Sequence, residues 1–466
     1  MRAIHPYLIN LQFAVCAFLT IISLTGAFAA DYYVSPQGKD SNPGTEIQPW
    51  LTIAKAADTL KAGDTVYIRG GIYTPQTPIT PKNSGTPDKR ITYCAYPGEV
   101  VTIDGQNVPL SRWYGLIKVV DKSFITISGL EVINSQYAGI WLSGSTGIIV
   151  KDNRASNTYS SGIGVWRSED VLIDGNDIRL ACTGRKEVDP HFPTQECLSI
   201  SGSNHVEVVN NHVHDSGNVG GGGGGEGIDV KNGSSYVKVS SNHVYNMNSV
   251  GIYVDAFRKH THDIQISGNR VYDSPGNGIV LASEQGGLLE RVTVCNNVIY
   301  GNTHNGITIG WALKPSNPLK EIRILHNTCY ANRRNGIYLG ASSGDGTSMP
   351  KDIVIRNNIC SGNEASQMDR YHTVPMEEHT VDHNLLYGPG RYKGDEFVDG
   401  NPLFVDPDNA DFHLRSGSPA IDSGIPTDEP REDFDGNMRT WGSAPDMGAF
   451  EYGSRKPRSG SVNSPF

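Results

Sequence analysis

The middle of the chain repeats one short pattern of hydrophobic and polar positions. The pattern reads apolar-x-apolar-x-x-Asn, and its first copy is Ile148-x-Val150 followed by Asn153. Alternating apolar positions over so few residues predict short β-strands. Subtracting successive asparagine positions gives steps of 23 to 35 residues. The repeat asparagines are Asn153, Asn176, Asn211, Asn242, Asn269, Asn297, Asn327 and Asn358.

A second short strand is predicted between successive asparagines. It begins with Gly-Ile and continues in alternation, as in Gly227-Ile228-Asp229-Val230. Each repeat then holds at least two strands and several turns, which leaves no room for a long helix. The leucine spacing of a leucine-rich repeat is missing, and a propeller blade needs longer antiparallel strands. We therefore predict an all-β fold, a right-handed parallel β-helix in which each repeat forms one coil.

The repeat asparagines have a structural interpretation. Asn tolerates the left-handed backbone conformation of a turn, and its amide can hydrogen-bond to the Asn of the next coil. We predict a ladder of stacked asparagines that holds the coils in register, not a set of catalytic groups.

The two flanks of the repeat predict caps. Ile53, Ala56, Ala57 and Leu60 follow a helical period, so a short amphipathic helix should cover the open first coil. The segment 401–452 is rich in Pro, Asp and Gly, and we expect it to fold back on the last coils. The expected divisions are a signal peptide (1–29), an N-terminal cap with the first coils (30–115), the repeat domain (116–369), a C-terminal cap region (370–453) and a flexible tail (454–466).

The first residues predict export. Arg2 precedes an apolar run over 11–27, and Ala27-Phe28-Ala29 has the small-x-small form of a signal-peptidase site. We expect a secreted protein, extracellular or periplasmic, with no membrane span after cleavage. Disulfides are permitted in such a compartment, and Cys182 with Cys197 is the best candidate pair.

Composition and charge narrow the function classes. Hydrophobic residues make up 37% and charged residues 19% of the chain, as in a folded protein. The formal net charge of −10 argues against nucleic-acid binding. No Gly-x-x-x-x-Gly-Lys loop is present, so nothing indicates a nucleotide cofactor. An anionic polymer would have to be bound through local cations or a metal ion.

Aligning the Gly-Ile strands brings charged residues together. Ile228 and Val230 should point into the coil, so Asp229 and Lys231 should point outward. Carboxylates placed this close raise one another's pKa unless a cation intervenes, and either Lys231 or a bound Ca²⁺ can be that cation. The alternative is a solvated ladder of salt bridges. The predicted outward cluster consists of Glu196, Glu226, Asp229, Lys231 and Asp255.

This cluster predicts β-elimination from a uronic acid. The C5 proton becomes removable when a cation neutralises the adjacent carboxylate. Lys231 is the predicted base, provided that nearby cations or desolvation lower its pKa, and Arg258 is the predicted neutralising or acidic group. The candidate Ca²⁺ ligands are Glu196, Glu226, Asp229 and Asp255, and the candidate substrate-binding residues are Tyr253, His260 and His191.

Two motifs stand near the ends of the mature chain, Asp31-Tyr32-Tyr33-Val34-Ser35-Pro36 and Ser418-Pro419-Ala420-Ile421-Asp422-Ser423-Gly424. Both resemble bacterial polysaccharide lyases of the pectate lyase family 9 type. The resemblance implies a β-helix over nearly the whole mature chain. It also implies a catalytic lysine on the strand that matches Gly276-Asn277-Gly278-Ile279-Val280 and paired calcium aspartates near Ser249-Val250. Both are missing here, although Glu226 stands at a ligand position.

The site resembles a second family. Glu226-Gly227-Ile228-Asp229-Val230-Lys231 is similar to the Glu-x-x-x-Val-Lys stretch of polysaccharide lyase family 6, which includes alginate lyase and chondroitinase B. This resemblance implies that the Glu binds calcium and the Lys is the base, with an arginine one coil later. Arg258 is the candidate arginine, at a spacing that does not match closely. Asp189-Pro190-His191 resembles part of the Asp-Pro-His-Asp signature of alginate C5-epimerases, with Phe192 in place of the last Asp.

We therefore predict a secreted, monomeric polysaccharide lyase that acts on an anionic, uronate-containing polymer and uses Ca²⁺. A glycoside hydrolase with Glu226 and Asp255 as its carboxylates is one alternative, and a C5-epimerase is another. The third is a non-catalytic carbohydrate-binding β-helix. Its aromatic platforms would be Trp141, Trp166, Tyr253 and Tyr338.

Overall fold

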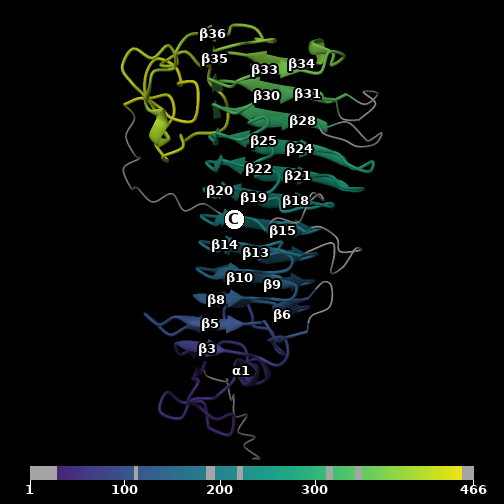
Figure 1. Cartoon of the computed structure of the whole chain (residues 1–466), viewed down its shortest axis with the longest axis vertical. Coiled ribbons are helices and arrows are strands. Elements are labelled where there is room, and N and C mark those ends of the chain that lie inside the picture. The colour runs from purple at the N-terminus through teal and green to yellow at the C-terminus, as the bar shows by residue number, and fades with distance from the viewer. Residues whose placement is uncertain are drawn as a thin grey trace, which may run out of the picture.

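The chain winds into a single stack of coils (Figure 1). The structure, a computed structural model, describes residues 29–109, 114–184, 195–217, 224–310, 319–341 and 349–453. Successive coils add one strand to each of three long parallel sheets, here called A, B and C. The predicted right-handed parallel β-helix is confirmed.

Sheet A is the first of the two 13-stranded sheets. Its strands carry the apolar-x-apolar half of the repeat, and Val237 and Val239 of one coil pair with Ile264 and Ile266 of the next. In order, they are β1 (Asp31–Val34), β2 (Thr65–Ile68), β4 (Ile91–Ala95), β7 (Ile125–Ser128), β10 (Thr146–Lys151), β13 (Glu169–Asp174), β16 (Asn204–Val209), β19 (Ser235–Ser240), β22 (His260–Ser267), β25 (Leu288–Cys295), β28 (Leu319–Leu325), β31 (Lys351–Arg356) and β34 (His379–Asp382).

Sheet B follows the repeat asparagine in each coil. It is also 13-stranded, with shorter strands. In order, they are β3 (Gly71–Tyr73), β5 (Val101–Asp104), β8 (Leu130–Ile133), β11 (Arg154–Ser156), β14 (Asp177–Arg179), β17 (His212–His214), β20 (His243–Tyr245), β23 (Arg270–Tyr272), β26 (Val298–Tyr300), β29 (Thr328–Tyr330), β32 (Ile359–Ser361), β35 (Leu385–Tyr387) and β36 (Val398–Asp399).

Sheet C is formed by the Gly-Ile strands and carries the candidate site. Its 10 strands are β6 (Gly115–Val120), β9 (Ala138–Ser143), β12 (Ile163–Trp166), β15 (Leu198–Ser201), β18 (Ile228–Lys231), β21 (Ile252–Asp255), β24 (Ile279–Ala282), β27 (Ile307–Ile309), β30 (Asn335–Leu339) and β33 (Ser366–Arg370).

The core runs inside the coils as one continuous apolar column. Ile228 and Val230 are fully buried, as are Ile252 and Val254 one coil later. Because side chains alternate along a strand, the residues between them point out of the coil. The column reaches from Val34 near the start of the stack to Leu386 near its end. This core fixes which side chains sheet C presents outward.

The predicted asparagine ladder is confirmed. The Nδ2 atom of Asn242 donates to Oδ1 of Asn269 at 3.0 Å, and each repeat Asn makes the same bond to the next coil. One expected feature is wrong: the left-handed residue is the one before the Asn, such as Ser241 with φ 56°. The ladder residue therefore acts through its amide, not through its backbone. A second ladder, which the sequence pattern did not predict, joins Asn302, Asn332 and Asn363.

The predicted helical cap is also confirmed. The helix α1 (Ile53–Thr59) begins where the Thr52 side chain accepts a hydrogen bond from the backbone N–H of Lys55 at 3.1 Å. Ile53, Ala56 and Ala57 are buried on one helix face and belong to the core cluster. The helix thus covers the first coil near β3 (Figure 1).

The C-terminal segment folds back along the side of the last coils, as predicted. It contains the antiparallel pair β37 (Phe404–Asp406) and β38 (Asp411–Leu414), and short 3₁₀ turns at Met376–Glu378 and Pro407–Asn409. It appears in yellow-green beside the upper coils (Figure 1). Its apolar residues pack on outward side chains of sheet B. The contact includes Phe404, Phe412, Leu414, Met447 and Phe450 from the cap, and Val298, Ile359 and Leu385 from the sheet.

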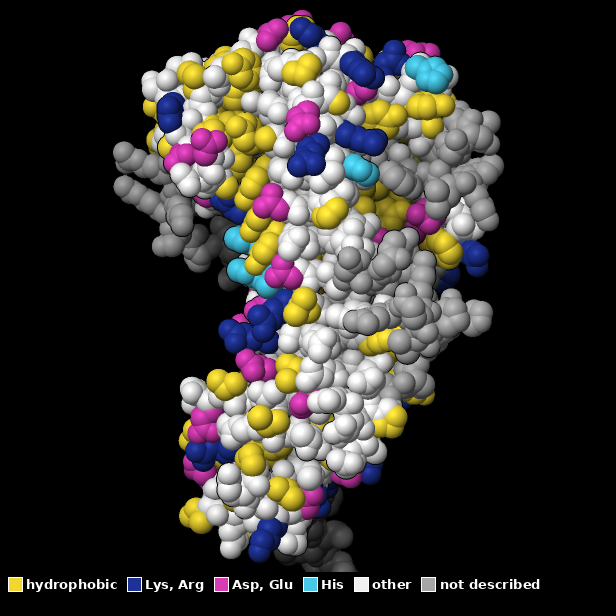
Figure 2. All heavy atoms as spheres, in the orientation of Figure 1, with side chains coloured by type: hydrophobic (Ala, Val, Ile, Leu, Met, Phe, Trp, Pro, Cys, Tyr) yellow, Lys and Arg dark blue, Asp and Glu magenta, His cyan; other side chains and the backbone are white. Residues whose placement is uncertain are grey.

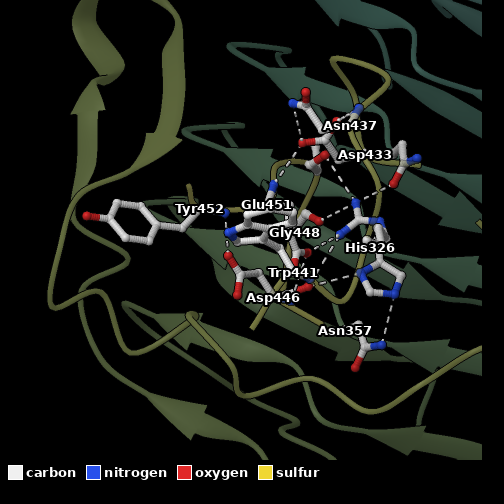
Figure 3. A network of polar contacts seen from close by, with 12 residues as sticks. His326, Asn357, Asp433, Asn437, Trp441, Asp446, Gly448, Glu451 and Tyr452 are labelled. Carbon is white, nitrogen blue, oxygen red and sulfur yellow. Dashed lines mark hydrogen bonds and ion pairs between the residues drawn. The ribbon is translucent and has the colours of Figure 1, made fainter. Parts of the chain in front are cut away.

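A buried polar network fastens this cap (Figure 3). The Arg439 side chain is 3% exposed and lies 3.6 Å from the Glu451 carboxylate. Both Glu451 oxygens accept backbone N–H groups, from Trp441 and from Asp446, at 3.1 Å each. His326 of the coil stack contacts the Asp446 carbonyl oxygen through Nδ1 at 3.1 Å. Burial lowers the pKa of His326 well below its usual range, so the ring is neutral.

The cysteines of the described ranges are all free thiols. The predicted pair, Cys182 and Cys197, is therefore not bridged here, although the two thiols lie within hydrogen-bonding contact. Cys329 and Cys360 are register partners on β29 and β32. Over the ranges described, no helix has the length and apolarity needed to cross a membrane. Acidic and basic side chains are interspersed along the face in Figure 2.

Candidate active site

The predicted charged cluster forms on the outward face of sheet C. Lys231 pairs in register with Ser201 of β15 and with Asp255 of β21. Asp229 pairs with Ser199 and Tyr253 in the neighbouring column. The spacing of strands places successive members of a column about 4.8 Å apart. Glu196 and Glu226 each stand two residues before their strand, so they too are in adjacent coils. We call Glu196, Glu226, Asp229, Lys231 and Asp255 the carboxylate–lysine cluster.

Lys231 is the cation inside this cluster. Its Nζ atom donates to Oε1 of Glu196 and lies 3.0 Å from Oδ2 of Asp229. Burial favours the neutral amine, but attraction to Asp229 and Glu196 outweighs it and raises the pKa of Lys231. This is opposite to the lowered pKa expected for a base. In the arrangement described, Lys231 is protonated and neutralises part of the negative charge.

The pKa values of Glu226 and Asp255 are shifted in the predicted direction. Burial, reinforced by the charge of Glu196, raises the pKa of Glu226 to about 7. Burial, reinforced by the charge of Glu284, raises the pKa of Asp255 to about 7. Burial is the larger cause in both, whereas the sequence argument considered only mutual repulsion. Two groups that titrate near neutral pH therefore lie beside a permanent cation.

Several polar atoms in the cluster and beside it have no partner among the described residues. Oε2 of Glu196, Oδ1 of Asp229 and Oγ of Ser199 are buried and make no hydrogen bond within the described structure. Buried carboxylate oxygens left in this way are costly, because they lose their hydration without compensation. Such atoms indicate a site that a ligand, a cation or ordered water completes.

The donor chemistry of the cluster suits a hard cation, since every candidate ligand is a carboxylate oxygen. The two unpartnered oxygens of Glu196 and Asp229 fit that role. However, within the described ranges no group of three or more His, Cys, Asp or Glu side chains is already arranged to hold a metal ion. Lys231 holds the position of the neutralising cation instead.

Glu284 is a site residue that sequence reasoning missed. The Tyr253 hydroxyl donates to its Oε1 atom at 2.5 Å, and its backbone N–H donates to Oδ1 of Asp255 at 3.2 Å. It stands in the loop after β24, two residues beyond Ala282, which is the register partner of Asp255. An alignment of the strands alone could not find it. Counting acidic residues in the loop just beyond each strand would have done so.

Two predicted site residues, Arg258 and His260, are not brought into the carboxylate–lysine cluster by any contact among the described residues, and a third is not described. Arg258 is exposed, has φ 60°, and its guanidinium lies 4.8 Å from the centroid of the Phe257 ring. His260 begins β22 on sheet A, where Nε2 lies 3.0 Å from a carboxylate oxygen of Glu290. His191 falls outside the described residues.

The coils, sheets and outward cluster together define a right-handed parallel β-helix protein with a polar site on one sheet. Residues 32–363 match the right-handed β-helix region of the Pel9A-like family. The chain belongs to that family, since this match spans more than half of its length.

Curated relatives cover parts of the chain. An uncharacterized Bacillus subtilis protein, YwoF, is 36% identical over 317 residues, which are 60% of this chain and 64% of YwoF. Pectate lyase PEL9 of Emericella nidulans is 34% identical over 144 residues, which are 29% of this chain and 35% of that enzyme. The chain thus spans less than two thirds of either relative's length.

Solved structures share the architecture at low identity. Pectate lyase Pel9A superposes with a TM-score of 0.55 and 16% identity, over 91% of this chain and 97% of that chain. The complex of XylC with xylose gives 0.54 and 14%, over 80% and 87%. These likenesses concern the fold. At the position where the family resemblance implies a lysine, Val280 is buried in β24.

Proposed function

We propose that this protein is an exported polysaccharide lyase that cleaves a uronate-containing polymer by β-elimination at the carboxylate–lysine cluster. The observation that carries the proposal is the pair of buried, unpartnered carboxylate oxygens on Glu196 and Asp229 beside a partly buried lysine, Lys231. In a purely structural ion pair, these buried oxygens would be expected to accept hydrogen bonds from the protein. Membership of the Pel9A-like family favours a polysaccharide as the ligand, and the apolar leader at 11–27 favours export.

Lys231 is the base in this proposal. It can accept the C5 proton only after its ion pairs with Glu196 and Asp229 are released, because both hold it protonated. The departing oxygen then takes a proton from Lys231, which holds the C5 proton at that point, or from water. Tyr253, held by Glu284, would orient the sugar beside Asp229. Arg258 would bind the uronate carboxylate once the sugar is in place.

We also propose that Ca²⁺ is the cation that releases Lys231. Glu196, Glu226 and Asp229 would hold it, with Asp255 as a further ligand, and it would neutralise these carboxylates together with that of the uronate. The protein supplies carboxylate oxygens that are free to bind the cation, and it supplies Lys231, which is close enough to accept the C5 proton once its ion pairs are released.

The decisive experiment is to follow the ultraviolet absorbance of unsaturated uronate while the protein is incubated with pectate, alginate and chondroitin, with Ca²⁺ or with a chelator. Wild type should produce the absorbance with one polymer, and Lys231→Ala should reduce the rate at least 1,000-fold, on the order of magnitude expected when a catalytic base is lost. The matched control is Lys151→Ala, which removes an exposed lysine at the end of β10 on sheet A.

Other outcomes would reject the lyase. New reducing ends without the absorbance would mean a hydrolase that uses Glu226 and Asp255. Exchange of the C5 hydrogen with solvent, without cleavage, would mean an epimerase. Binding of a polymer with no chemical change would mean a non-catalytic carbohydrate-binding protein. Unchanged absorbance in Lys231→Ala would keep the lyase but remove Lys231 from its mechanism.

A further inference from the structure

A second site lies on the same outward face of sheet C, toward the N-terminal end of the stack. It is a cavity of about 500 Å³ over β6, β9 and β12. We call it the aromatic–basic cleft. It is lined mainly by Tyr114, Lys118, Trp141, Ser143, Trp166 and Arg167.

Its floor is a set of aromatic rings outside the coil core. The Trp141 and Trp166 rings lie 5.2 Å apart and are tilted by 40°, and Tyr137 meets Trp141 edge-on at 6.2 Å. Trp141 is buried, while Trp166 stays partly exposed above it. The next residue in the Trp141 column is Gly164, where a Cβ would come within 2.5 Å of the indole. The glycine therefore leaves room for this ring. The exposed part of the Trp166 indole offers an apolar surface of the kind on which the apolar side of a sugar ring packs.

The walls of the cleft carry uncompensated positive charge. Nζ of Lys118 lies 3.5 Å from the centroid of the Tyr114 ring, and Arg167 is exposed just after β12. Across the described ranges, neither has a carboxylate within ion-pair distance, whereas Arg154, Arg291 and Arg356 are all paired. The whole chain has a net charge of −10, whereas these two cations give the cleft a locally positive wall beside its aromatic floor. Arginine binds a carboxylate through two parallel N–H groups.

Register connects this cleft to the carboxylate–lysine cluster. Trp166, Ser201 and Lys231 occupy one column of sheet C, so Trp166 and Lys231 are two strand steps apart, or about 10 Å. In the neighbouring column Trp141 is followed by Gly164, Ser199 and Asp229. The sheet places only glycine and serine between the two sites. No large side chain of the sheet separates them.

We propose that the aromatic–basic cleft binds a uronate unit of the same polymer chain whose neighbouring units reach the carboxylate–lysine cluster. A sugar ring stacks on Trp166, and its carboxylate is bound by Arg167 and Lys118. The polymer then runs along the stack axis, across strands rather than along one. The inference rests on the proposed function for the class of polymer, and it adds that the protein acts within long anionic chains and binds short ones weakly.

The test measures binding in a Lys231→Ala background, so that no turnover interferes. The ligands are long and short oligomers of galacturonate and of alginate, with neutral xylan oligomers for comparison, titrated by calorimetry. The combined substitutions Lys118→Met and Arg167→Met should weaken binding of a long uronate oligomer at least tenfold and leave the shortest unchanged. Arg179→Met, which removes an exposed arginine at the end of β14 on sheet B, is the matched control and should change nothing.

A second variant separates stacking from folding. Trp166→Leu should weaken binding of long oligomers, while Trp166→Phe, which keeps a ring, should retain most of it; thermal unfolding of both reports any loss of structure. If the double Met variant binds long uronate oligomers as tightly as its parent, or if no uronate oligomer binds the parent, the proposal is overturned. Equal loss for neutral xylan also overturns the anionic specificity. Loss of binding in a protein that shows no lyase activity would keep this inference and reject the proposed function.

Discussion

The C-terminal cap network and the carboxylate–lysine cluster both contain buried carboxylates. They differ in whether the carboxylate oxygens have hydrogen-bond partners. In the cap, both oxygens of Asp433, Asp446 and Glu451 accept hydrogen bonds, mostly from backbone N–H groups. In the cluster, one oxygen each of Glu196 and Asp229 has no partner among the described residues. The carboxylates named in both sites are buried, so burial of the carboxylates does not distinguish the two sites.

This difference separates a structural use of charge from a functional one. Backbone donors in the cap stay in place whatever is bound, and they fix the fold around Arg439. The cluster leaves oxygens vacant, and its one cation is a lysine on a flexible side chain. A site that must bind something pays in stability for acceptors kept free.

Arg439→Met should have the largest effect on folding. It leaves Glu451 and its neighbouring carboxylates buried without their cation, and we expect the free energy of unfolding to fall by about 3–5 kcal/mol. Denaturant unfolding measures the loss. Arg415→Met, which removes an exposed arginine of the same cap, should cost far less. Equal losses in the two variants would mean that the network does not hold the cap.

Calcium should stabilise the folded protein through the cluster. A ligand that binds only the native state adds about 2.7 kcal/mol at a free concentration 100 times its dissociation constant. Thermal unfolding with and without Ca²⁺ measures this, and Mg²⁺ is the control because it requires a stricter octahedral geometry. Asp229→Asn should abolish the shift. If Ca²⁺ changes nothing in wild type, Lys231 is the only cation that the cluster takes.

Acid should weaken the cap through His326. The unfolded chain protonates this ring near pH 6.5, while burial and Arg439 keep the folded pKa well below that. The unfolded state therefore binds more protons than the folded state. The contribution of neutral His326 to the free energy of unfolding is fully present above about pH 6.5, and it falls by up to about 1.4 kcal/mol per pH unit below that pH. Unfolding of wild type and His326→Gln from pH 7 to pH 5 measures the difference. Parallel slopes in the two proteins would contradict it.

Asp229→Asn should have the smallest effect on stability and the opposite sign. It removes one negative charge from a site with more carboxylates than cations, and we expect a gain of about 0.5–1 kcal/mol together with loss of activity. Denaturant unfolding measures the gain in stability, and the absorbance assay measures the loss of activity. A destabilisation comparable to that of Arg439→Met would mean that the cluster is a structural ion pair.

The fold could be predicted because its determinants repeat. The same apolar-x-apolar-x-x-Asn pattern appears eight times, and each copy confirms the placement of the others. Strand register followed from alignment alone, and Lys231 does pair with Ser201 and Asp255. The left-handed backbone conformation was predicted at the ladder Asn, but it occurs at the residue before it. At that position the sequence varies between Asp, Gly, Asn, Ser and His, so no single residue type marks it.

The site was predictable only where it follows the repeat. Asp229 and Lys231 stand on β18, and Glu196 stands two residues before the adjacent strand β15, so the repeat brings the three together. Glu284 and the true surroundings of His260 depend on loops between strands, whose path no periodic pattern specifies. The pKa of Lys231 was expected to fall and instead rises, because ion-pair distances inside a cluster cannot be read from spacing.

The side-on position of the C-terminal cap has a mechanical consequence. Coils that touch only their neighbours can peel from an end one at a time. The cap contacts Val298 of β26, Thr328 of β29, Ile359 of β32 and Leu385 of β35, and so ties coils that do not adjoin. Pulled from the C-terminal end, these coils would resist as one block until the cap tears away, and only then unwind in sequence.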